Sequence, residues 1–168
     1  MAKLRHLAIQ CDDPDATAKF FADVFEFEEM SRIGTDLRND GGVVYMSDGT
    51  MNVALINIVD PDFPNYEPKG LNHIGFVVRD LGETVAKATA HGATTRRAGD
   101  EIREGSLWEF KMETPEGIAF DLYDIYGRGW PGISGLEEFG ISTMVTAGEH
   151  EAGNALAGGP ASSGAVDA

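Results

Sequence analysis

The sequence is poor in several features that mark particular classes of protein. Its single cysteine, Cys11, excludes an internal disulfide. The chain has only 13 Lys and Arg residues but 28 Asp and Glu residues. The resulting formal net charge of −15 would repel nucleic acid backbones and anionic membrane surfaces. No run of roughly 18 apolar residues exists to cross a bilayer, and the N-terminal MAKLRHLAIQ lacks the apolar run of a signal peptide. We therefore expect a soluble, cytoplasmic protein that binds neither nucleic acid nor membrane.

The remaining composition is that of an ordinary globular protein. At 168 residues and 42% hydrophobic content, the chain fits one domain or two small modules that share a core. The stretch 147–168 is rich in Gly, Ala and Ser and has no large apolar anchor, so it is predicted to be a flexible tail. A C-terminal extension, 127–146, precedes it.

Two stretches of the chain follow one pattern. RHLAIQCDDPDATAKFF predicts a strand and then a helix with Asp13 as its N-cap. NHIGFVVRDLGETVAKA predicts the same elements with Asp80 as the N-cap. An ungapped shift of 67 residues places His6 on His73 and Asp13 on Asp80. The sequence therefore predicts an internal duplication.

Three further strands are predicted after each helix, between turns rich in Gly and Asp. Their approximate ranges are 26–32, 42–47 and 51–58 in the first half, and 94–98, 106–113 and 118–124 in the second. Each half is thus a βαβββ module, because one strand and one helix come before the three strands. We expect an α+β paired domain within 1–126, with modules at about 4–58 and 71–126 and a linker at 59–70. The two modules are expected to form a curved mixed sheet around a central cavity.

The predicted helices carry apolar stripes. The first places Phe20, Phe21, Val24 and Phe25 on one stripe, and the second places Leu81, Val85 and Ala88 inward. Cys11 is predicted to be a small buried side chain, and His91 is predicted to end the second helix.

Three polar residues interrupt apolar strands. His6 and His73 each need partners for two ring nitrogens once buried, and a buried carboxylate at Asp121 requires a cation. The 67-residue shift carries Asp121 onto Ala54, so four equivalent positions hold His, Ala, His and Asp. Two imidazoles and one carboxylate form the facial triad of metal sites. We therefore predict a divalent metal at His6, His73 and Asp121, with Fe(II) favoured and Mn, Co, Ni or Zn also accepted.

The strand-borne histidines of RHLAIQ and NHIGFVV, the segment TPEGIAFDLYD and the doubled module resemble the vicinal oxygen chelate superfamily, over about residues 4–126. This family includes glyoxalases, epimerases, extradiol ring-cleaving dioxygenases and metal-free bleomycin-resistance-type binding proteins. In glyoxalase-like and epimerase-like members the resemblance implies a fourth ligand, often a Glu that also acts as a base, where this chain has Ala54. Extradiol dioxygenases use two histidines and one carboxylate at the other three positions.

The resemblance therefore implies a non-heme Fe(II) extradiol-type dioxygenase acting on a small catechol or enediol. Such a substrate would chelate the metal through two oxygens and leave a position for dioxygen. Two departures are evident: the family's oxygenases usually carry Glu at the position of Asp121, and they use an additional pocket histidine that this chain lacks. Tyr123, on the same strand face as Asp121, and Tyr45 are the candidate catalytic hydrogen-bond donors.

Two alternatives stay open. One is a glyoxalase-like or epimerase-like lyase or isomerase with a base elsewhere than residue 54, and the other is a metal-free small-molecule binding protein. Trp108, Phe110 and Met112 either wall a cavity or pack under a helix, and Trp130 is predicted to cover a cavity mouth or contact a partner subunit. A homodimer is expected, because modules of this size often complete their burial by dimerising.

Overall fold

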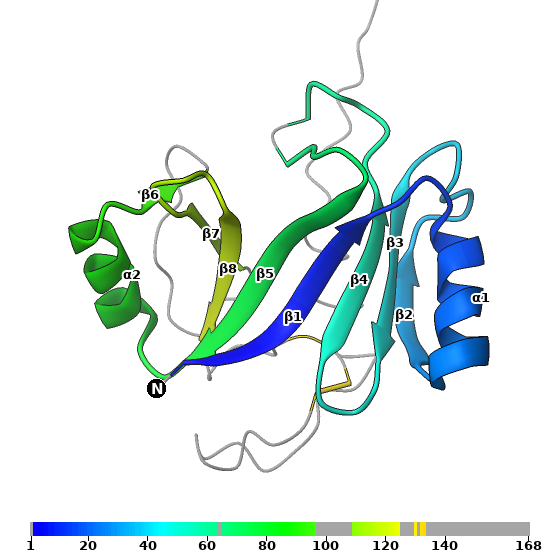
Figure 1. Ribbon diagram of the computed structural model, residues 1–168, viewed down its shortest axis with the longest axis horizontal. Coiled ribbons are helices and arrows are strands. Elements are labelled where there is room, and N and C mark those ends of the chain that lie inside the picture. Colours follow the sequence, from blue (N-terminus) through cyan, green and yellow to red (C-terminus); the bar gives the residue numbers. More distant parts are fainter. Residues whose placement is uncertain (1, 64, 97–108, 125–129, 131, 134–168) are drawn as a thin grey trace, which may run out of the picture.

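The computed structural model describes residues 2–63, 65–96, 109–124, 130, 132 and 133. These residues form one mixed sheet of eight strands that carries two helices (Figure 1). The predicted α+β class with two βαβββ modules is confirmed. The tail at 147–168 and most of the extension at 127–146 lie outside the described residues.

The elements of the first module are β1 (Lys3–Gln10), α1 (Pro14–Phe25), β2 (Glu28–Ile33), β3 (Gly42–Ser47) and β4 (Asn52–Asn57). Those of the second are β5 (Gly70–Val78), α2 (Leu81–Ala90), β6 (Thr94–Thr95), β7 (Phe110–Glu113) and β8 (Ala119–Asp124). The strands predicted at 94–98 and 106–113 are shorter in the part of the chain that the structure describes. Most of the gap between them falls on residues outside it.

The strand order is β2-β3-β4-β1-β5-β8-β7-β6. Within the modules, β1 pairs with β4 and β5 pairs with β8, both in parallel. The modules meet where β1 and β5 pair in antiparallel fashion. The two strands that carry His6 and His73 are therefore neighbours at the centre of the sheet (Figure 1).

Two β-bulges interrupt the pairing of β1 with β5. Leu4 pairs with Phe76 and His6 with Gly75, so Arg5 is an extra residue on β1. On β5 the extra residue is Asn72, because the partners on β1 skip it. A bulge therefore precedes each histidine, at positions that the 67-residue repeat makes equivalent. Bulges of this kind change the direction in which neighbouring side chains point.

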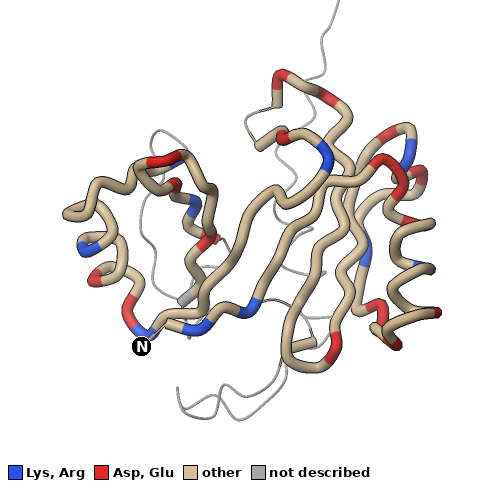
Figure 2. Tube along the Cα trace, in the orientation of Figure 1, with Lys and Arg blue, Asp and Glu red and all other residues tan. Residues whose placement is uncertain are grey.

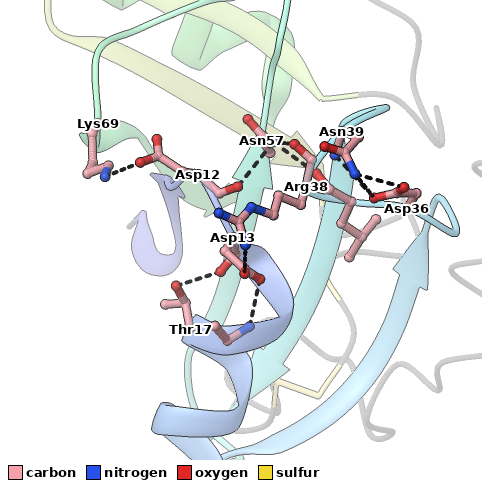
Figure 3. Close-up of polar contacts among 10 residues, drawn as sticks. Asp12, Asp13, Thr17, Asp36, Arg38, Asn39, Asn57 and Lys69 are labelled. Carbon is pink, nitrogen blue, oxygen red and sulfur yellow. Dashed lines mark hydrogen bonds and ion pairs between the residues drawn. The ribbon is translucent and has the colours of Figure 1, made fainter.

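Both helices begin at the predicted N-caps. Asp13 Oδ1 accepts a hydrogen bond from the backbone N–H of Ala16 at 2.9 Å, and Asp80 Oδ1 accepts one from Glu83 at 2.7 Å. These bonds satisfy backbone donors that the first helical turn leaves without partners. Figure 3 shows the start of α1, where Arg38 also approaches Asp13.

The helices differ in how they pack. In α2, Leu81 and Val85 are buried and Ala88 packs against them, as predicted. The stripe predicted for α1 does not form its core face, because three of its members are 54–55% exposed: Phe20, Val24 and Phe25. Instead α1 contacts the sheet through Pro14, Ala18 and the partly buried Phe21, which lie about one turn apart.

Acidic residues outnumber basic ones along the chain, 28 to 13. Figure 2 shows acidic residues on both helices and on the turns that border them, with fewer basic residues between. Among the described residues, none of the helices has the length and apolarity that crossing a bilayer requires.

Candidate metal centre

The ring of His6 is held on several sides. The residue is 1% exposed, and its Nδ1 lies 2.7 Å from Oδ1 of Asn52, its cross-strand partner on β4. The indole of Trp130 stacks on the imidazole, with ring centres 4.6 Å apart and planes inclined by 5°. The position and rotation of this imidazole are therefore fixed by Asn52 on β4 and by Trp130.

The ring of His73 is held by the bulge residue beside it. Its Nδ1 lies 2.6 Å from Oδ1 of Asn72, and Nδ2 of Asn72 donates to the backbone carbonyl of Asn65 at 2.9 Å. A carbonyl only accepts hydrogen bonds, so the amide nitrogen must face Asn65 and the amide oxygen must face the imidazole. Nδ1 of His73 therefore faces a hydrogen-bond acceptor.

The Nε2 atoms of the two histidines meet at the centre of the site. They are 3.3 Å apart, and Nε2 of His73 is 3.1 Å from Oδ2 of Asp121. Because each Nδ1 faces an amide oxygen, each Nε2 of a neutral imidazole presents a lone pair. Three electron-pair donors thus lie around Nε2 of His73, and their lone pairs and negative charge need a compensating cation or proton nearby.

Two charged residues that sequence reasoning missed complete the cluster. Lys111 forms an ion pair with Oδ2 of Asp121, its cross-strand partner, and lies 3.2 Å from Oε2 of Glu109. The other oxygen of Glu109 accepts a hydrogen bond of 2.5 Å from Nε1 of Trp130. Two carboxylates and one ammonium leave one negative charge beside the imidazoles, which favours a further cation.

Burial and these charges shift the pKa values of the site. Burial lowers the pKa of His6 to about 4, although Glu109 and Asp121 favour its charged form, so the imidazole is neutral at pH 7. Burial alone would raise the pKa of Asp121, but Lys111 and His73 outweigh it and hold this pKa well below its usual range. Burial opposes the charge on Lys111, and the two carboxylates nevertheless raise its pKa.

The donor chemistry of His6, His73 and Asp121 fits a divalent metal. Donors bound to one ion at 2.0–2.1 Å stand roughly 3.0–3.4 Å from one another, and the two distances above fall in this range. Over the described part of the chain, however, no three His, Cys, Asp or Glu side chains form a ready-made metal cluster. The Lys111 ammonium contacts the Asp121 oxygen that a metal would use, so binding requires Lys111 to release it.

The fourth repeat-related position offers no donor. Ala54 is 3% exposed and pairs with Ala8 on β1 and Tyr45 on β3. Asn57, three residues further along β4, donates to the carbonyls of Leu37 and, at 3.1 Å, Arg38 (Figure 3). Its amide is therefore engaged by the loop before β3.

The other predicted residues are placed as follows. Tyr123 is buried with its ring against the edge of Trp130, at 5.2 Å between centres, whereas Tyr45 is half-buried on β3; catalytic roles for both stay predictions. Trp130 faces the histidines. Phe110 and Met112 pack under α2 rather than at the site, and Trp108 lies outside the described residues. The structure places Cys11 in the core and His91 at the C-cap of α2, as predicted.

Comparison with known proteins identifies the family. The model of the Glyoxalase/Bleomycin resistance protein/Dioxygenase superfamily matches residues 3–122. The chain belongs to this superfamily. Enzymes of the superfamily often bind divalent metals. No curated protein matches the chain.

Several solved structures share the fold of this chain. A hypothetical protein from Bacillus halodurans C-125 is 14% identical, with 72% of this chain and 92% of that chain covered and a TM-score of 0.54. A variant of Streptomyces coelicolor methylmalonyl-CoA epimerase, in complex with 2-nitronate-propionyl-CoA, is 21% identical over 71% and 94% of the two chains, with a TM-score of 0.54. Methylmalonyl-CoA epimerase from Mycobacterium tuberculosis is 16% identical over 72% and 86%, with a TM-score of 0.53. At these identities the similarity establishes the architecture alone.

Proposed function

We propose that this superfamily member is a metal-dependent oxygen chelate enzyme, and specifically an extradiol-type dioxygenase that acts on a small catechol or enediol. The observation that supports it is the convergence of His6 Nε2, His73 Nε2 and Asp121 Oδ2, with no fourth donor at Ala54. Three protein ligands leave coordination positions for both oxygens of a substrate and for dioxygen. A bound Fe(II) would lower the pKa of a substrate hydroxyl and hold the reactants together.

The residues of the chain have distinct roles in this proposal. Asn52 and Asn72 orient the imidazoles so that both Nε2 lone pairs face the ion. When a metal takes Oδ2 of Asp121, the Lys111 ammonium stays beside Glu109 and stabilises negative charge on an ionised substrate oxygen. Trp130 covers one face of His6 and limits the access of water to the site.

An epimerase reaction is a weaker proposal, despite the fold shared with methylmalonyl-CoA epimerases. Such a reaction needs a base that moves a carbon-bound proton, and Ala54 cannot supply one. Both carboxylates at the site are engaged, because Glu109 accepts from Trp130 and Lys111, and Asp121 is ion-paired to Lys111.

Metal-free ligand binding is the second candidate, and the ion pair of Lys111 with Asp121 favours it. In that case the ammonium, and not a metal, compensates the buried carboxylate permanently. The site would then bind a small ligand without turning it over.

Metal content and oxygen consumption distinguish these candidates. We would purify the wild-type protein anaerobically, measure its metal content, load it with Fe(II) and follow oxygen uptake with a panel of catechols. His73→Ala removes one proposed ligand. His91→Ala is the matched control, because His91 is exposed at the end of α2 and its ring contacts the carbonyl of Lys87, while its backbone N–H bond to Ala88 survives the substitution.

We expect about one metal ion per wild-type chain, catechol-dependent oxygen uptake, and loss of both in His73→Ala but not in His91→Ala. Protein that binds the metal but consumes no oxygen with any catechol would refute the dioxygenase. Protein that takes up no divalent metal would favour the metal-free binding module. Light scattering on the same samples tests the predicted homodimer.

A further inference from the structure

We propose that Asn72 is a positioning residue that fixes the hydrogen of His73 on Nδ1 and so directs its Nε2 lone pair into the site. The β-bulge makes this contact possible. Successive side chains of a regular strand point to opposite faces, whereas the extra residue in β5 brings the amide of Asn72 within 2.6 Å of the adjacent ring. Asn72 is 5% exposed, so water does not compete for this bond.

The repeat shows that the two histidines obtain their acceptors from different places. His6 uses Asn52 on β4, but the position equivalent to Asn52 in the second module is Ala119, which has no polar side chain. The position equivalent to Asn72 in the first module is Arg5, whose guanidinium only donates and cannot accept from an imidazole N–H. Each module therefore supplies one acceptor, and Asn72 compensates for the alanine at 119.

Asn72 is itself anchored by the segment between the modules. Its Nδ2 donates to the backbone carbonyl of Asn65, and this bond excludes the flipped amide that would offer a donor to His73. The anchor uses only the backbone of residue 65, because the side-chain oxygen of Asn65 is buried without a partner. The linker thus sets the hydrogen position at the site through one side chain.

The test is a measurement of ring protonation in full-length, metal-free protein labelled with ¹⁵N. Long-range ¹H–¹⁵N NMR spectra at about pH 9, above the ordinary imidazole pKa, report which ring nitrogen carries the hydrogen. The signals of His73 are assigned by their loss in His73→Gln. The variants are Asn72→Ala, which removes the acceptor, Asn72→Asp, which keeps it, and Asn65→Ala, which keeps the backbone anchor.

We expect the hydrogen on Nδ1 of His73 in the wild type, in Asn72→Asp and in Asn65→Ala. In Asn72→Ala we expect a single hydrogen that exchanges between Nδ1 and Nε2. A wild-type hydrogen on Nε2, or an unchanged Nδ1 hydrogen in Asn72→Ala, would overturn the inference. If Asn72→Ala does not fold, the Asn72→Asp variant tests the proposal instead. A hydrogen on Nε2 of His73 in that variant would contradict the proposed role of Asn72.

The consequence for metal binding rests on the proposed function and is measured separately. Calorimetric titration should show that Asn72→Ala binds Zn²⁺ about 10- to 100-fold more weakly than the wild type. This is the usual loss when a metal-binding histidine loses the hydrogen-bond partner of its other ring nitrogen. Asn65→Ala should bind as the wild type does. If the wild type binds no metal, the proposed function fails while the NMR result on Asn72 still stands. If Asn72→Ala binds Zn²⁺ as tightly as the wild type although its His73 hydrogen has moved, the positioning role alone is overturned.

Discussion

Replacing Gly75 with alanine tests the position of Trp130 against the two histidine strands. A Cβ at residue 75 would stand 2.5 and 2.6 Å from Cη2 and Cζ2 of Trp130, and 2.8 Å from Cβ of His6. All three distances are too short for carbon atoms in contact. The indole is 0% exposed and the third atom is fixed to the backbone of β1, so neither can move aside freely.

We expect Gly75→Ala to lower the free energy of unfolding by about 2 kcal/mol, within the range of about 1–3 kcal/mol for overpacking a well-packed interior. For a chain of this size the melting temperature should fall by roughly 6 °C. Urea unfolding followed by circular dichroism measures the first quantity, and thermal unfolding the second.

Gly82→Ala is the matched control. Its Cβ would meet only Oδ1 of Asp80, at an ordinary 3.6 Å, and the residue lies in the first turn of α2. We expect it to be neutral or to stabilise by about 0.5 kcal/mol, because alanine favours the helix over glycine. In a Trp130→Leu background, the cost of Gly75→Ala should fall by at least half. If Gly75→Ala is tolerated as well as Gly82→Ala, the stacked position of Trp130 is wrong.

Three further measurements test other parts of the structure. Lys111→Met should lower the free energy of unfolding of the metal-free protein by about 3 kcal/mol in urea, because it leaves Asp121 as a buried charge without its cation. Added Zn²⁺ should restore most of the lost stability. If the variant is as stable as the wild type without metal, the ion pair is contradicted. Burial raises the pKa of the Cys11 thiol, so a thiol reagent at pH 8 should label it slowly in native protein and quickly in urea. Rapid labelling of native protein would place Cys11 outside the core. Asp80→Ala should cost about 1 kcal/mol in thermal unfolding because it removes the acceptor for the Glu83 N–H, and no loss would mean that this N-cap is not used.

The duplicated pattern was sufficient to predict the architecture and to indicate that His6, His73 and Asp121 lie near one another in it, whereas a metal bound to them stays a prediction. The separation of His6 and His73 identified equivalent strands, and β1 and β5 are indeed paired. A polar residue that recurs at the same place in apolar strands is a strong signal, because burial must be compensated at each occurrence. Asp121 does not recur, because its equivalent is Ala54, and it was predicted from the cost of burying a carboxylate without a cation.

The residues that surround these three were beyond prediction for identifiable reasons. A bulge depends on how two strands pair, and nothing in the alternation of β5 reveals that Asn72 shares a face with His73. Lys111 left a weaker signal, since it alternates with Glu109 in a strand that had to pair with β8, opposite a buried carboxylate. The sequence predicted a metal as the partner of the Asp121 carboxylate and did not predict the Lys111 ammonium.

The exposed stripe of α1 has a similar cause. Helical periodicity groups Phe20, Val24 and Phe25 correctly, but it does not say which of two adjacent apolar faces meets the sheet. The small side chain of Ala18 allows a closer approach than the phenylalanines would, and the helix rests on that face.

The antiparallel ladder between β1 and β5 is both the joint between the two halves and the support of both imidazoles. A slip of one residue along this ladder would turn one imidazole away from the other. Neither half alone could assemble the cluster, and two halves docked out of step would bring only one ring to the centre. Correct docking of the halves during folding and assembly of the paired imidazoles are therefore one event, and a misdocked chain would lack the contact between His6 and His73.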